Sequence, residues 1–155
     1  MFRLSSILLI VLSLAACAPR GEIGLGEAVP SGTVHDIWVA KFRPNAPPEE
    51  GQRSPPRPDR TIFERYAVSV PATHQTGQIE WPSETPNAAT DFVTVEQQQY
   101  PTSTTFASAV ARSDGPRSGT TLLFVHGYNY THGEAVYQTA QIAHDFDVPS
   151  PTVLF

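Results

Sequence analysis

The sequence predicts an α/β fold, and three consecutive features near the end of the chain carry that prediction. A strand is expected at residues 120–125, where a largely apolar run of five residues, 121–125, stops abruptly at His126 and Gly127. A helical pattern occupies residues 131–146, and a second apolar run starts at Thr152. A buried strand, a crossover helix and another buried strand form a βαβ unit, in which the two strands are parallel.

Periodicity predicts further elements upstream. Residues 34–42 contain five large apolar side chains and are expected to form a strand. Residues 62–70 alternate between two faces, which is typical of a half-buried strand, and Pro71 closes it. A short strand is expected at residues 92–95 and one or two helical turns at residues 106–112.

Two long segments are predicted to be loops. Residues 43–59 contain six prolines and several charges. Proline cannot donate to a sheet ladder, so this segment is expected to be a solvated loop. Residues 71–90 are rich in Pro, Thr, Ser and Gly and are also expected to lack regular structure. Residues 96–104 are polar, and no element is predicted there.

The helix that follows the His-Gly turn has the clearest pattern. Thr131 and Glu134 have the spacing of a capping box, in which each side chain binds a main-chain N–H of the first turn. Pro149 marks the end of the helix. His144 and Asp145 lie near that end and are expected to be solvated. Apolar residues recur every three or four positions and predict one apolar stripe: Val136, Thr139 or Ala140, Ala143 and Phe146.

The first residues have the pattern of a secretory signal. Arg3 provides a basic start, and an apolar stretch with a few serines continues to Ala16. This stretch is too short to span a bilayer, which takes about 20 residues. We therefore expect residues 1–16 to be a signal peptide. Residues 17–33 lack periodicity and are expected to be a tether.

The signal ends at Cys17, the only cysteine of the chain. Leu14-Ala15-Ala16-Cys17 resembles the lipobox of bacterial lipoproteins. The resemblance implies cleavage before Cys17 and lipid attachment to its sulfur. Because Ala18 follows instead of Asp, it also implies an outer-membrane location that faces the periplasm of a bacterial cell envelope. The alternative is an ordinary signal peptide that contains a cysteine.

The composition argues against several classes of function. The net charge is −5, Lys41 is the only lysine, and no basic stripe is present. Binding to nucleic acid needs clustered cations, so no nucleic-acid partner is expected. The five histidines have no neighbouring Asp, Glu or Cys at a metal-ligand spacing. Neither a metal nor another cofactor is therefore predicted.

The sequence from residue 125 to 129, Val-His-Gly-Tyr-Asn, resembles the α/β-hydrolase superfamily. More narrowly, it is similar to a bacterial family of uncharacterised, esterase-like α/β hydrolases of the DUF900 type. The resemblance implies that residues 34–155 form an incomplete hydrolase domain, the amino-terminal part of a three-layer αβα sheet. It also implies that Tyr128 offers its main-chain N–H to an oxyanion, while Gly127 allows close approach. His126 is expected to structure this loop, because the catalytic histidine of such enzymes follows the nucleophile and the acid.

The nucleophile of such an enzyme is missing. No Gly-x-Ser-x-Gly occurs in the 155 residues. We therefore expect a truncated serine hydrolase, inactive by itself, whose full-length relatives hydrolyse small-molecule carboxylic esters. Acyl transfer would use the same loop and stays open. The alternative from another class is a lipid-anchored envelope module that binds a partner and has no catalytic activity.

Overall fold

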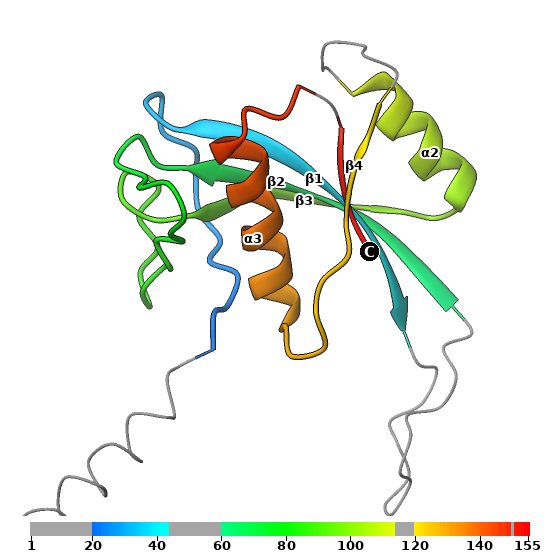
Figure 1. The fold of residues 1–155 in the computed structure, drawn as a ribbon, viewed down its shortest axis with the longest axis horizontal. Helices are drawn as coiled ribbons and strands as arrows, with labels where there is room; N and C mark the ends of the chain where they lie inside the picture. Colours follow the sequence, from blue (N-terminus) through cyan, green and yellow to red (C-terminus); the bar gives the residue numbers. More distant parts are fainter. Residues whose placement is uncertain (1–19, 44–59, 114–119, 150) are drawn as a thin grey trace, which may run out of the picture.

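The computed structural model describes residues 20–43, 60–113, 120–149 and 151–155. The predicted signal, Cys17 and most of the Pro-rich loop lie outside these residues. The described part contains a single five-stranded sheet in the order β3-β2-β1-β5-β4 (Figure 1). Its strands are β1 (Thr33–Arg43), β2 (Arg60–Val70), β3 (Val93–Tyr100), β4 (Leu122–Phe124) and β5 (Thr152–Leu154). Its helices are α2 (Ser103–Arg112) and α3 (His132–Asp145). Neither of these helices is long and apolar enough to cross a membrane.

The predicted βαβ unit is present. The chain leaves β4, passes through α3 and returns as β5, which pairs with β4 in parallel. β5 also pairs in parallel with β1, so this three-residue strand joins the βαβ unit to the antiparallel strands β1, β2 and β3. β5 is thus an inner strand, and β4 lies at the edge of the described sheet.

The two helices cover opposite faces of the sheet. α3 packs on one face, where its buried side chains join the core side chains of β1, β2 and β5: Ile37, Val39, Tyr66, Val68, Val70 and Leu154. Side chains alternate across a strand, so Trp38 lies on the other face. There Phe106 of α2 contacts Trp38 and Phe63, with ring centroids 5.8 and 5.1 Å apart. The result is an α/β/α arrangement, as expected for part of an α/β-hydrolase sheet.

Two elements are longer than the sequence pattern predicted. β3 continues to Tyr100, through a polar stretch for which no strand was predicted. Edge strands are held by main-chain bonds on one side only, so exposed glutamines are compatible with pairing there. α2 begins at Ser103 because Thr102 and Thr105 form a capping box, each side chain binding the main-chain N–H of the other residue. The predicted helix at residues 106–112 therefore lacked its first turn.

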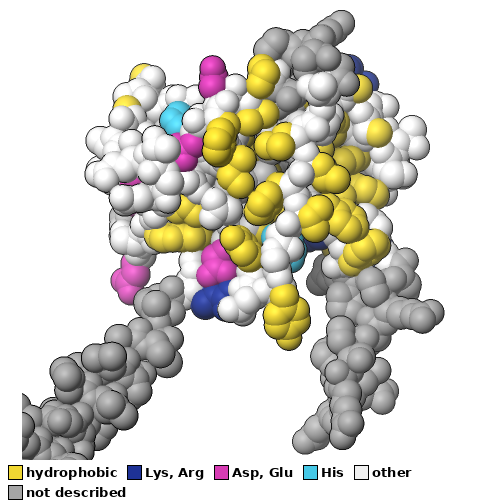
Figure 2. All heavy atoms as spheres, viewed as in Figure 1, with side chains coloured by type: hydrophobic (Ala, Val, Ile, Leu, Met, Phe, Trp, Pro, Cys, Tyr) yellow, Lys and Arg dark blue, Asp and Glu magenta, His cyan; other side chains and the backbone are white. Residues whose placement is uncertain are grey.

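One element is shorter than predicted. The strand expected at residues 120–125 contains only Leu122–Phe124. Val125 has left the ladder and is 62 % exposed, and Leu123 is 59 % exposed. Figure 2 shows many hydrophobic side chains on the face that contains β4. The apolar run therefore predicts the strand correctly but overestimates how much of it is buried.

The N-terminal segment (residues 20–26) lies against the domain although it belongs to the expected tether. Gly24 donates its N–H to the Tyr137 hydroxyl, which in turn donates to the Gly24 carbonyl. Main-chain bonds of 2.8 and 3.2 Å join Gly24 and Gly26 to Thr94. Because Gly133 has no side chain, the segment can pass close to the start of α3.

Candidate active site

The β4–α3 loop (residues 125–131) connects the carboxyl end of a parallel strand to a helix N-terminus. Ligands of open α/β sheets bind beyond such strand ends. The loop closes on itself through a bond from the Tyr130 N–H to the Gly127 carbonyl. His126 donates from Nδ1 to the same carbonyl at 2.9 Å. The loop then enters α3, whose predicted capping box between Thr131 and Glu134 is present.

The main-chain N–H groups of Gly127, Tyr128 and Asn129 form no hydrogen bond with any described residue. The Tyr128 side chain points fully into solvent. Free N–H groups at the N-terminus of a helix favour negative charge, because the helix dipole adds to their own partial charges. The turn is therefore chemically able to accept an anionic group. The oxyanion role of Tyr128 and the structuring role of His126 remain predictions.

A cleft of about 690 Å³ borders this loop. Gly127, Asn129 and Tyr130 line one end of it, and Gly77 and Gln141 line the other. The cleft therefore follows α3, whose 14 residues correspond to about 20 Å. Its walls combine apolar groups with amides, which is typical of small-molecule sites.

Arg20 connects the N-terminal segment to the β4–α3 loop. Its guanidinium forms a salt bridge of 2.6 Å with Glu134 and also donates to the main-chain and side-chain oxygens of Asn129. The bonds from Arg20, and then the Thr131 N–H, lower the pKa of Glu134 to about 2. The sequence pattern gave no indication of this contact, because Arg20 lies within the expected tether.

A polar cluster lies at the same end of the sheet. The buried Glu64 carboxylate accepts bonds from the Lys41 ammonium at 2.7 Å and from the Tyr66 hydroxyl at 2.9 Å. His132, the first residue of α3, lies 2.9 Å from the Tyr66 hydroxyl through Nε2. Burial, then the nearby Lys41 charge, lower the pKa of His132, and burial followed by Glu64 raises the pKa of Tyr66. The cluster keeps both rings neutral near pH 7.

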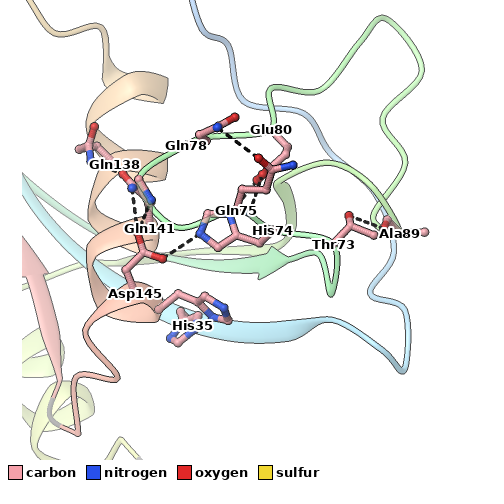
Figure 3. Close-up of polar contacts among 12 residues, drawn as sticks. His35, Thr73, His74, Gln75, Gln78, Glu80, Ala89, Gln138, Gln141 and Asp145 are labelled. Carbon is pink, nitrogen blue, oxygen red and sulfur yellow. Dashed lines mark hydrogen bonds and ion pairs between the residues drawn. The ribbon is translucent and has the colours of Figure 1, made fainter.

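Three of the scattered histidines meet at the opposite end of α3, together with carboxylates. His74 lies between Glu80, at 2.8 Å from Nδ1, and Asp145, at 2.9 Å from Nε2 (Figure 3). His35 binds His144 at 3.1 Å, and the His144 ring lies 5.2 Å from the His74 ring. Burial opposes the charge on His74, but hydrogen bonds to Glu80 and Asp145 outweigh it and raise the pKa of the imidazole.

This second cluster corrects one expectation. Asp145 is not solvated: its side chain is 6 % exposed and accepts bonds from His74, Gly77 and Gln141. His144, for which the same was expected, is half-buried and bonded to His35. Asp145 therefore fixes the loop at residues 71–90 to the end of α3. Sequence reasoning missed the pair of His74 and Asp145 because its members are 71 positions apart. Within the described ranges, no group of three His, Cys, Asp or Glu side chains is arranged to hold a metal ion.

Residues 101–155 match the model of a family described as an alpha/beta hydrolase of unknown function (DUF900). The matched segment contains α2, β4, the β4–α3 loop, α3 and β5. Together with the α/β/α layers, the match supports a relationship of this chain to the α/β hydrolases. Searches of curated proteins and of solved structures found no match.

Proposed function

We propose that this chain contains the oxyanion loop of a serine hydrolase that acts on carboxylic esters. The observation that carries the proposal is the set of N–H groups between β4 and α3 to which no described residue is bonded, beside a cleft. In this reaction the nucleophile attacks the ester carbonyl, and the negative charge that develops on its oxygen is stabilised by main-chain donors. Tyr128 supplies one such donor, and Gly127 leaves room for the substrate.

The remaining catalytic groups are not identified in these residues. The 155 residues contain no Gly-x-Ser-x-Gly, so we place the nucleophile, its base and its acid in further sequence of the same gene. A second N–H donor then follows the nucleophile. By this proposal residues 1–155 alone do not turn over an ester.

The membrane attachment belongs to the same proposal. Cleavage before Cys17 and attachment of a diacylglycerol group to its sulfur would anchor the domain to a bacterial outer membrane on the periplasmic side. Incorporation of labelled palmitate that is lost in Cys17→Ser would support it. Incorporation that persists in Cys17→Ser would contradict it.

The test of the activity uses two proteins, residues 17–155 and the product of the complete gene. The proposal expects turnover of a short-chain ester by the complete product, with a fluorophosphonate bound to its serine, and none by residues 17–155. Turnover by residues 17–155, or a complete gene without any Gly-x-Ser-x-Gly, would contradict it. The second outcome would favour the non-catalytic envelope module.

A further inference from the structure

The position of Arg20 limits the distance between the candidate site and a membrane. Arg20 follows Cys17 by three residues. An extended chain spans at most about 3.3–3.6 Å per residue, so Arg20 can lie no more than about 11 Å from the α-carbon of Cys17. If Cys17 carries its acyl chains in the bilayer, as the proposed function requires, Arg20 is held near the headgroups.

Arg20 is in turn fixed to the β4–α3 loop. It binds Asn129 of the loop and Glu134 of α3, and it lines the cleft. Figure 1 shows that the chain reaches the domain beside the turn between β4 and α3. Arg20, the loop and one end of the cleft therefore lie at the same end of the molecule.

The side chains at this end suit a lipid interface. Tyr128 is fully exposed, and Val125 and Phe42 are 62 % and 54 % exposed. Aromatic rings with a polar group favour the headgroup region of bilayers. Arg60 is exposed at the same strand ends and adds positive charge, which anionic lipids attract. Lys41 and Arg20 also lie there, but they are paired with Glu64 and Glu134.

The opposite end carries the exposed carboxylate of Asp147, just beyond the end of α3. The other carboxylates near that end are paired: Asp145 and Glu80 with His74, and Asp36 with Arg65. An anionic surface would repel the exposed Asp147 carboxylate. The exposed charges of Arg60 and Asp147 therefore favour the same orientation as the short connection to Cys17.

We propose that the carboxyl end of the sheet, with Tyr128 foremost, rests on the bilayer that anchors the chain, and that the adjacent cleft takes the acyl ester of a membrane lipid. The inference rests on the proposed function and names the substrate class of that site. An ester that enters from the bilayer reaches the free N–H groups without crossing the periplasm.

The test places a fluorescent label at each end of the molecule. Cys17 is the only cysteine and is consumed by lipidation, so Tyr128→Cys or Ala72→Cys gives a single labelling site. Ala72 is exposed and follows β2, at the far end. The lipidated proteins are placed in vesicles of phosphatidylethanolamine and phosphatidylglycerol with a nitroxide-labelled lipid as quencher.

The proposal expects the label at position 128 to lose most of its emission and the label at position 72 to keep it. Val125→Cys provides a second reporter if the first variant does not fold. Equal quenching at both ends, no quenching at position 128, or no acyl group on Cys17 would overturn the proposal. The quenching measurement needs no turnover, so the proposed orientation can fail while the oxyanion role of Tyr128 holds. The oxyanion role can equally fail while the orientation holds.

The substrate class has its own measurement on the product of the complete gene. Hydrolysis of a phospholipid ester in vesicles should fall severalfold in Cys17→Ser, while hydrolysis of a soluble short-chain ester stays unchanged. Equal rates on the vesicle substrate with and without the anchor would overturn the assignment of a membrane lipid.

Discussion

His74 is a buried imidazole held between two carboxylates, so its substitution tests the account at the scale of one residue. His74→Gln leaves Asp145, which is 6 % exposed, without its charged partner. We expect the free energy of unfolding to fall by about 2–4 kcal/mol. Urea denaturation measures this loss. Thr76→Ala, on the exposed surface of the same loop, should change stability by less than about 0.5 kcal/mol.

The pH dependence of that loss follows from the sign of the pKa shift. The folded protein raises the pKa of His74 above its ordinary value of 6.5. The stabilisation that protonated His74 provides is therefore fully present below pH 6.5. It is lost as the pH rises through the higher pKa that His74 has in the folded protein. We expect His74→Gln to cost more at about pH 5.5 than at about pH 8.5. An equal cost at both pH values would show that the imidazole carries no charge in the fold.

At the scale of an element, the cap of α3 connects local sequence to the site. The Thr131 hydroxyl accepts a bond from the Glu134 N–H and fixes the point where the loop ends and the helix begins. Thr131→Ala should lower the free energy of unfolding by about 1 kcal/mol. Thr131→Ser keeps the capping hydroxyl and should therefore keep most of this stabilisation of about 1 kcal/mol. Chemical denaturation of both variants measures the difference. A serine variant as unstable as the alanine variant would contradict the capping role.

The N-terminal segment is the second element with a clear test. The buried Tyr137 hydroxyl binds both main-chain groups of Gly24. Tyr137→Phe leaves the Gly24 N–H without its partner, whereas the Gly24 carbonyl keeps its bond from the Thr94 N–H. The loss costs about 1–3 kcal/mol and should loosen the segment. Faster trypsin cleavage after Arg20 is the expected result. Tyr130→Phe, at an exposed ring, serves as the control and should leave cleavage unchanged.

The elements differ in how well the sequence predicts them, and the reasons are physical. α3 could be predicted because Thr131, Glu134 and the apolar stripe are local signals, although Phe146 of that stripe lies beyond the helix and is 77 % exposed. The continuation of β3 to Tyr100 could not, because pairing with β2 overrides the polar composition. The contacts of Arg20 with Glu134 and of His74 with Asp145 connect residues 114 and 71 positions apart, and only the folded chain brings them together.

At the scale of the molecule, the free edge of β4 and its apolar surroundings should govern behaviour in solution. Leu123 and Phe155 are exposed, and β4 has one strand neighbour in the described sheet. Exposed apolar edge strands favour association. We expect residues 17–155 to associate as their concentration rises and Leu123→Lys to associate less. Sedimentation velocity over a range of concentrations provides the measurement, and identical behaviour of the two proteins would contradict this expectation.

The central claim is that the main-chain N–H of Tyr128 stabilises an oxyanion. Tyr128→Pro removes this N–H, whereas Tyr128→Ala keeps it and removes only the exposed ring. The measurement is kcat for a soluble ester with the product of the complete gene, after circular dichroism has verified the fold of both variants. The account predicts that kcat falls by about 10²–10³ in Tyr128→Pro and changes little in Tyr128→Ala. Equal kcat values for the two variants would contradict it.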